Sequence, residues 1–272
     1  MEHAQMEQLV LTKSNKVNNV ITKLLYKTQV LSALVIQNDG EIKDFERVAA
    51  TIIDDPAIRN VILAPNGIVS NVYPLESNEK VIGLHYFSKG EGNQEAIAAK
   101  ASGQLVLGGP FHLIQGGQAL VGRLPVYLGE KNEENFWGLV SVTLNYPQAL
   151  EGAELEQLRN QGFAYEIWRI SPDTNKKQMI ANSNYIYNQH ASYVEKTMTI
   201  LNAEWYFRLS PIRNWYQYPE TWIFTFAGLF TGDKMLRQFA TIFEQHLDEQ
   251  HLFARIGGDE FILIFKHTDR CV

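Results

Sequence analysis

The sequence predicts an α+β fold in which one long N-terminal helix is followed by two antiparallel sheets. Three observations lead to this prediction. Near the start, apolar residues recur every seven positions, at Val10, Val17, Leu24 and Leu31. From Ile58 onward, the apolar period becomes that of strands. A second, shorter set of strand-like segments follows later in the chain, after another helical stretch.

The first element is an amphipathic helix over residues 6–36, which no proline or glycine interrupts before Gly40. Lys13 and Lys27 occupy the second core position of the heptad, so the pattern is not that of a regular coiled coil. Two interpretations remain open: the helix lies on its own domain, or it is the stalk of a dimer. We expect a homodimer that forms through the face of Val10, Val17, Leu24 and Leu31.

The first sheet begins with a predicted hairpin. Strands over residues 58–64 and 68–73 are joined by Pro65, Asn66 and Gly67, which are typical turn residues. The remaining elements of this half are a helix over 42–53 before the hairpin, a helix over 92–102, and strands over 104–107, 119–128 and 136–145. This order is that of a PAS-like sensor fold, although other α+β domains share it.

The second sheet follows a predicted helix over residues 147–161 that ends at Gly162. Its strands are expected over 163–170, 178–181, 195–201 and 203–209. After Phe230 the pattern becomes helical again, and a strand-turn-strand unit is expected over 252–256 and 261–265.

Composition excludes several classes of protein. The chain has 272 residues, with 30 acidic against 24 basic side chains and a formal charge of −6. A mildly acidic chain lacks the basic patch that duplex nucleic acid attracts, so no nucleic-acid partner is expected. The single cysteine, Cys271, forms neither an internal disulfide nor a cysteine-rich metal site.

The sequence shows no segment long and apolar enough to insert into a membrane. The N-terminus has no basic segment followed by an apolar one, so no signal peptide is visible. The longest apolar run is Trp222–Phe230. As a helix it would reach about 14 Å, whereas the hydrocarbon core of a bilayer is about 30 Å thick. The chain as written is therefore expected to be soluble.

Arg123 is the residue of the first sheet most suggestive of a site. It stands between apolar neighbours in a predicted strand. An inward-facing arginine would be a buried cation that requires an anion, whereas an outward-facing one would be an ordinary surface residue. Nearby, Gly108, Gly109 and Pro110 end a strand and let the backbone bend close to a cavity. His85 and His112 lack partners at metal-ligand spacing.

Six short motifs in order, between Phe45 and Pro219, resemble the CHASE family. These are the extracytoplasmic sensor domains of bacterial diguanylate cyclases and histidine kinases and of plant cytokinin receptors. The motifs are Ala64-Pro65-Asn66-Gly67, Tyr73-Pro74-Leu75-Glu76, Ile82-Gly83-Leu84, Gly109-Pro110-Phe111, Leu124-Pro125-Val126-Tyr127 and Phe136-Trp137-Gly138. The resemblance implies a long helix that carries two PAS-like sheets, and a small-molecule ligand.

The resemblance also bears on the ligand. In cytokinin-binding members a threonine two residues before the proline contacts the hormone, and here Arg123 stands at that position. This departure argues against an adenine-type hormone. We expect a cavity between the strand of Arg123 and the segment Gly108–Leu113, with a small carboxylate or other anion held by Arg123. Tyr73, Tyr86 and Tyr127 are candidate wall residues.

A second motif lies near the C-terminus, where Gly257 and Gly258 precede the adjacent carboxylates Asp259 and Glu260. Such a pair could hold a divalent metal beside a triphosphate. With Asp233 at the appropriate distance upstream, the segment resembles the GGDEF domain of diguanylate cyclases. The resemblance implies that Gly257 and Gly258 let GTP approach the backbone, that Asp259 binds Mg²⁺, that Glu260 serves the catalytic step, and that Asp233 contacts guanine.

Parts of that family's pattern are missing. In that family, a strand with a further metal-binding aspartate and a guanine-binding segment come before the part that begins here at Thr231. Neither is present, because Thr231 directly follows the apolar run that ends at Phe230. No product-inhibition motif stands at Asp248–His251. We expect a sequence joined across a deletion, with no functional Mg²⁺ or GTP site in this chain.

The domain organisation that follows is a helical stalk (1–52), a membrane-distal PAS-like subdomain (53–150) and a membrane-proximal one (151–221). A truncated transmembrane start (222–230) and an incomplete α/β GGDEF fragment (231–272) come after them. The predicted function is a periplasmic ligand sensor of an inner-membrane cyclic di-GMP signalling protein. The alternatives are an active diguanylate cyclase and the sensor of a GGDEF-containing phosphodiesterase.

Overall fold

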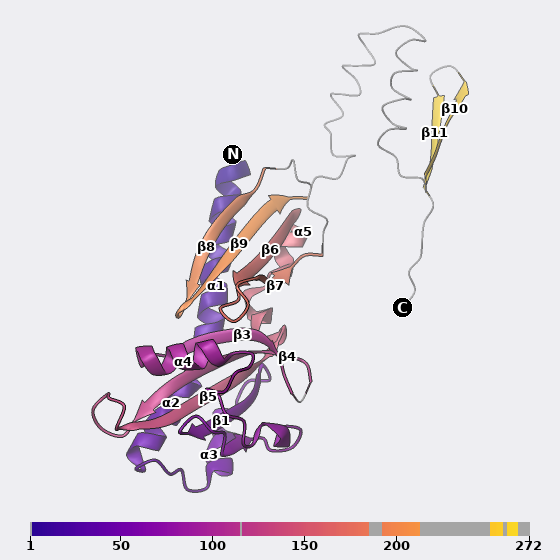
Figure 1. Ribbon diagram of the computed structural model, residues 1–272. Coiled ribbons are helices and arrows are strands. Elements are labelled where there is room, and N and C mark those ends of the chain that lie inside the picture. The colour runs from indigo at the N-terminus through magenta and orange to yellow at the C-terminus, as the bar shows by residue number, and fades with distance from the viewer. Residues whose placement is uncertain (1, 115, 185–191, 213–250, 258–259, 266–272) are drawn as a thin grey trace. The chain divides into compact units, whose positions relative to one another are not determined.

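The computed structural model describes residues 2–114, 116–184, 192–212, 251–257 and 260–265. The chain divides into two units, Met1–Arg213 and Asn214–Val272. The first unit contains the N-terminal helices and two antiparallel sheets, which confirms the predicted fold class for this part of the chain (Figure 1).

The N-terminal helix is present but divided at Tyr26, into α1 (Glu2–Leu25) and α2 (Lys27–Gln37). The side chain of Thr28 donates a hydrogen bond of 2.7 Å to the carbonyl of Leu25. The backbone N–H of Gln29 bonds to Tyr26 instead of Leu25, which tightens one turn. The two halves pack on different sheets: α1 contacts β8 and β9 of the four-stranded sheet, whereas α2 contacts β4 and β5 of the five-stranded sheet.

The first sheet has the strand order β2-β1-β5-β4-β3, with every neighbouring pair antiparallel. A short helix, α3 (Phe45–Ile52), precedes it. The strands of the sheet are β1 (Ile58–Pro65), β2 (Asn71–Tyr73), β3 (Val106–His112), β4 (Gln118–Tyr127) and β5 (Phe136–Tyr146). Between β2 and β3 the chain forms the short helix η1 (Glu79–Val81) and the helix α4 (Asn93–Ser102). The predicted hairpin forms, and Asn66 and Gly67 adopt positive φ values of 52° and 79° in its turn.

The two faces of this sheet have different coverings. Gly122 of β4 faces the N-terminal helices, and a Cβ there would lie 2.6 Å from a methyl carbon of Leu25. Because side chains alternate along a strand, Val121 and Arg123 face the opposite side. That side is covered by α4 and by the segment that contains Val81 and Tyr86.

The second sheet has the order β7-β6-β9-β8, again antiparallel throughout. Its strands are β6 (Phe163–Ile170), β7 (Lys177–Asn182), β8 (Val194–Ile200) and β9 (Ala203–Pro211). It is the smaller sheet, with four strands against five. Alternate residues of β9, among them Trp205, Phe207 and Leu209, are fully buried in the core.

The single helix predicted over 147–161 is wrong in detail. The segment forms η2 (Gln148–Ala153) and α5 (Glu156–Asn160), separated at Glu154, whose φ is 52°. Lys13 of α1 reaches this break, and its ammonium donates to the carbonyls of Ala153 and Glu154 at 3.1 and 2.7 Å. Lys13 is thus a buried cap for the broken helix, and burial lowers its pKa.

The proposed dimer face also needs correction. Val10, Val17 and Leu31 are completely buried in the chain's own core, and Leu24 is 5% exposed. The helix therefore lies on its own domain, and these side chains are not available to a second copy. A homodimer of this chain stays a prediction.

The second unit has one described feature, a hairpin of β10 (His251–Gly257) and β11 (Glu260–Phe265). This confirms the predicted strand-turn-strand unit. The segment Trp222–Phe230, read above as a truncated transmembrane start, lies outside the described residues. Among the helices that are described, none combines the length and apolar character needed to cross a bilayer.

Candidate functional site

A cavity of about 410 Å³ lies against the face of the first sheet that carries Arg123. Its floor is formed by β1, β5 and β4 through Ile62, Thr143 and Val121. The walls come from the segment 84–93, which leads into α4, and from the end of β3 and the residues after it, 111–114. The cavity thus lies between the strand of Arg123 and part of the predicted Gly108–Leu113 segment.

Arg123 lines this cavity with its side chain buried, 5% exposed. Its Nε and Nη1 atoms are inaccessible to solvent and have no hydrogen-bond partner among the described residues. No ion pair of the described part of the chain includes it. A guanidinium is always charged and carries five donors, so this group is strongly undersatisfied.

Two aromatic rings hold the guanidinium in place. Its central carbon lies 4.8 Å from the ring centroid of Tyr86 and 5.5 Å from that of Phe111. Burial raises the pKa of the Tyr86 hydroxyl, although the charge of Arg123 and the nearby Ser141 and Arg123 hydrogen-bonding groups act in the opposite direction. Tyr86 therefore stays neutral at ordinary pH and does not supply the negative charge that Arg123 lacks.

A polar neighbour shares this lack of partners. Ser141 of β5 pairs with Arg123 of β4 on one side and with Ile62 of β1 on the other, so all three face the same side of the sheet. The Ser141 side chain is completely buried, and its hydroxyl makes no hydrogen bond of good geometry in the described part of the chain, although it lies close enough to the Tyr86 hydroxyl to lower the pKa of that group. Buried polar groups are normally satisfied, so two adjacent exceptions indicate a place for a ligand.

A second buried arginine provides the contrast. Arg169 of β6 also contacts Phe111, with its central carbon 5.7 Å from the ring centroid. Unlike Arg123, it is paired: its Nη2 lies 3.0 Å from Oε1 of Glu95 in α4, and both side chains are 5% exposed. Phe111 therefore separates a neutralised guanidinium from an unneutralised one.

The other predicted sensor residues divide. Leu113 lines the cavity, as do Tyr86 and Arg123. Gly108 does not line the cavity but packs against the ring of Phe111, which does; a Cβ at Gly108 would lie 2.7 Å from that ring. Tyr73 packs against the core on the helix side of the sheet. Tyr127 donates a hydrogen bond of 2.9 Å to the carbonyl of Lys100, near the other end of α4. Neither Tyr73 nor Tyr127 lines the cavity, which corrects their assignment as walls.

Sequence reasoning missed Phe111, Glu95 and Arg169 as parts of the site. Phe111 stands in a motif quoted above, but only the fold places its ring between two arginines. Arg169 shares the strand parity of Phe163 and Ile167, which are buried, and that parity is a signal that could have identified it.

Of the residues assigned to GTP and Mg²⁺, Gly257 and Glu260 end and begin the two strands of the hairpin and pair with each other. Asp233, Gly258 and Asp259 lie outside the described residues. Within the described ranges, no group of three or more histidine, cysteine, aspartate or glutamate side chains could hold a metal ion.

Comparison with known proteins adds three findings. The CHASE domain family matches residues 31–180, more than half of the chain. The family described as diguanylate cyclase, GGDEF domain, matches residues 212–271. No curated protein matches the chain.

Among solved structures, the chain is similar to an extracellular ligand binding receptor from Desulfohalobium retbaense, with 12% identity and a TM-score of 0.60. The match covers 76% of this chain and 40% of the receptor, so the chain spans well under half of that protein. The periplasmic domain of Vibrio cholerae LuxQ is also matched, at 10% identity over 74% of this chain and 97% of that domain, with a TM-score of 0.38. The likeness to the receptor supports the fold alone. The family match, together with a fold of one long helix and two antiparallel sheets, identifies the chain as a member of the CHASE family of sensor domains, continuing into a segment of the GGDEF family.

Proposed function

We propose that the Arg123 cavity binds a small carboxylate, and that the chain is the ligand-sensing part of a cyclic di-GMP signalling protein. The observation that carries the proposal is the buried Arg123 guanidinium with two unpartnered nitrogens. A buried cation without a counter-ion is costly, and a carboxylate that reaches it forms charge-assisted hydrogen bonds.

The lining of the cavity limits the size and character of the ligand. A volume of about 410 Å³ lies within the range typical of small-molecule sites. Ile62, Val81 and Val121 offer an apolar surface to the body of the ligand. The charged groups at the rim, Lys89 and Glu91, are exposed and do not neutralise Arg123. A compact acid with a short apolar body fits this arrangement.

The GGDEF segment gives the signal its proposed output. In a membrane protein that contains both domains, the sensor would lie outside the cytoplasm, and the ligand would change the relative packing of helices that lead to the cyclase. We propose the sensor boundaries as 1–52 for the helical part, 53–150 for the distal subdomain and 151–221 for the proximal one. The sensor of a GGDEF-containing phosphodiesterase remains the alternative.

The test is a thermal-shift screen of the purified chain against sodium acetate, malonate, succinate, benzoate and phenylacetate, each beside its uncharged amide. An acid at 100 times its Kd stabilises the native state by about 2.7 kcal/mol, which is about 5–10 °C for a domain of this size. We expect one or more acids, and not the amides, to raise the Tm of the wild type.

Two variants complete the test. Arg123→Met should lose the shift, whereas Arg47→Met should keep it, because Arg47 is 83% exposed and lies in a surface pair with Asp44. Equal stabilisation by acids and amides would contradict the proposal. A shift that survives in Arg123→Met would contradict it as well, and so would a wild type that no acid stabilises.

A further inference from the structure

We propose that the second sheet supplies positioning residues for the ligand cavity of the first. Asp173 and Gln178 hold the two segments that wall the cavity, so that carboxylate affinity depends on residues of the proximal subdomain. This inference rests on the proposed function, and it concerns how the Arg123 site is shaped and regulated.

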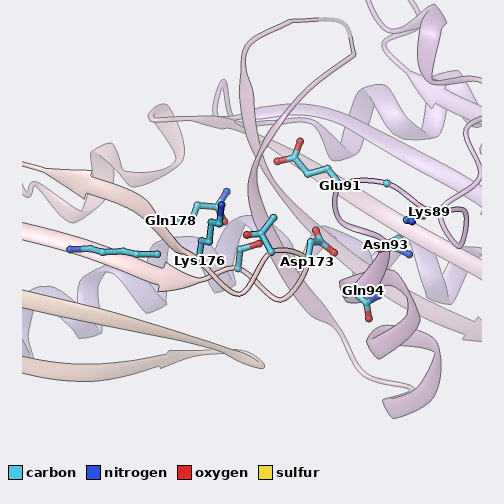
Figure 2. A pocket seen from close by; sticks show the side chains of 11 residues that line it. Lys89, Glu91, Asn93, Gln94, Asp173, Lys176 and Gln178 are labelled. Atoms are coloured by element: carbon cyan, nitrogen blue, oxygen red, sulfur yellow. The ribbon is translucent and has the colours of Figure 1, made fainter.

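The first wall is the start of α4. The carboxylate Oδ2 of Asp173, in the turn after β6, accepts a hydrogen bond of 2.7 Å from the backbone N–H of Gly92. Gly92 is the N-cap position of α4, where backbone donors need an acceptor and negative charge is favourable. Figure 2 shows Asp173 next to Asn93 and Gln94, which begin this helix.

Gly92 also touches the ligand site. Its φ is +81°, and a Cβ there would lie 2.9 Å from the ring of Phe111 and 3.3 Å from Nη2 of Arg123. The backbone at Gly92 therefore packs directly on the guanidinium that we expect to bind the ligand. A shift of Gly92 of a few tenths of an ångström would change the space beside Arg123.

The second wall is the end of β3. Gln178 of β7 donates a hydrogen bond of 2.6 Å from Nε2 to the carbonyl of Pro110, the residue before Phe111. The amide oxygen of Gln178 accepts a hydrogen bond of 2.7 Å from Nε of Arg169. One side chain of the second sheet thus links the wall of the cavity to the buried Arg169–Glu95 pair.

These contacts form one connected cluster rather than scattered surface bonds. Glu95 lies in the first turn of α4, the helix that Asp173 caps, and Phe111 lies between Arg169 and Arg123. An open groove of about 590 Å³ borders the cluster, and Asp173 and Gln178 line it together with Lys89, Asn93 and Lys176 (Figure 2). Because the groove is open to solvent, water can take the place of a lost contact of Asp173 or Gln178, and the backbone at Gly92 or Pro110 is then no longer held by the second sheet.

Coupling of this kind is reciprocal. If Asp173 and Gln178 stabilise the geometry that binds a carboxylate, then the carboxylate stabilises their contacts by the same factor. Ligand binding would thereby strengthen the contacts of Asp173 and Gln178 in the second sheet. This sheet packs on α1, and it lies closer in sequence to the GGDEF segment than the first sheet does.

The experiment takes the acid that gives the largest thermal shift in the screen and measures its binding by calorimetry, in the wild type and four variants of the full chain. Asp173→Ala and Gln178→Ala should each weaken binding by about fivefold or more. Asp173→Asn keeps an acceptor for the Gly92 N–H, so it should bind within about twofold of the wild type. Lys176→Ala is the matched control in the same loop and should also bind within about twofold, because no hydrogen bond among the described residues joins its side chain to Gly92 or Pro110, the partners of Asp173 and Gln178.

A readout without ligand separates this inference from the proposed function. In Asp173→Ala the amides of residues 92–96 should exchange with solvent faster than in Asp173→Asn. If the wild type binds the acid and Asp173→Ala and Gln178→Ala bind equally well, the inference is overturned while the proposed function stands. If exchange at 92–96 is unchanged in Asp173→Ala, the proposed role of Asp173 in holding the start of α4 is refuted, whether or not any acid binds.

Discussion

Replacing the two buried arginines by methionine, one at a time, should change the free energy of unfolding by clearly different amounts. Arg123 and Arg169 are equally buried, at 5% and 4% exposure, and both contact the ring of Phe111. Only Arg169 has a carboxylate partner, Glu95. The pair of variants therefore compares an unneutralised cation with a neutralised one at nearly the same place in the fold.

The magnitudes follow from what each substitution leaves behind. Arg169→Met leaves the Glu95 carboxylate buried without a counter-ion, at a cost of about 3–5 kcal/mol. Arg123→Met removes an unpaired ion whose burial costs several kcal/mol, and it loses contacts with two rings worth about 1–2 kcal/mol each. Without ligand, Arg123→Met should therefore be about as stable as the wild type, or more stable.

The assay is urea and thermal unfolding of the full chain, in a buffer free of carboxylates and phosphate. The free energies of unfolding of the two variants should differ by at least about 2 kcal/mol, which is about 4–8 °C in Tm for a domain of this size. If both variants lose the same stability, Arg123 has a counter-ion in the free protein and the case for an anionic ligand fails.

Three further predictions concern other parts of the chain. Leu24→Ala should reduce the free energy of unfolding by about 2–5 kcal/mol without changing the sedimentation coefficient, because Leu24 lies in the chain's own core; a change from dimer to monomer would contradict this. Burial, and to a smaller extent the nearby Glu156, raises the pKa of Tyr165 to about 12 from its ordinary value of about 10. Between pH 10 and 12 the tyrosine therefore loses its proton in the unfolded chain but keeps it in the folded one, so the free energy of unfolding falls as pH rises. Tyr165→Phe should show a shallower fall in urea unfolding across that range, and identical pH profiles would count against it. With GTP and Mg²⁺ the purified chain should form no more cyclic di-GMP than Glu260→Ala, because the sequence carries the carboxylates of only one strand of a two-metal site; turnover above that variant would show that the chain is an active cyclase.

Much of the fold could be predicted because the responsible signals are local. The hairpin turn at Asn66 and Gly67 and the shift from helical to strand period are written in adjacent residues. The breaks at Tyr26 and Glu154 could not be predicted in this way. Each depends on a competing partner, the Thr28 hydroxyl in one case and the distant Lys13 ammonium in the other.

The site was predictable only in part, for a related reason. The strand of Arg123 is buried on both faces, so alternation of polar and apolar residues does not indicate which way Arg123 points. Gly122 decides it, since its missing side chain makes room for Leu25 on the helix side. The heptad of Val10 and Leu24 was consistent with either a dimer or an intramolecular core, and only the packing of two sheets along one helix distinguishes them.

A crystal structure of the chain with the acid that stabilises it most would show whether Arg123 binds a carboxylate. We predict a carboxylate within hydrogen-bond distance of the Arg123 guanidinium, between the rings of Tyr86 and Phe111, with the body of the acid on Val121. An acid bound elsewhere, or an Arg123 side chain turned away to a protein carboxylate while the acid occupies the cavity, would contradict it.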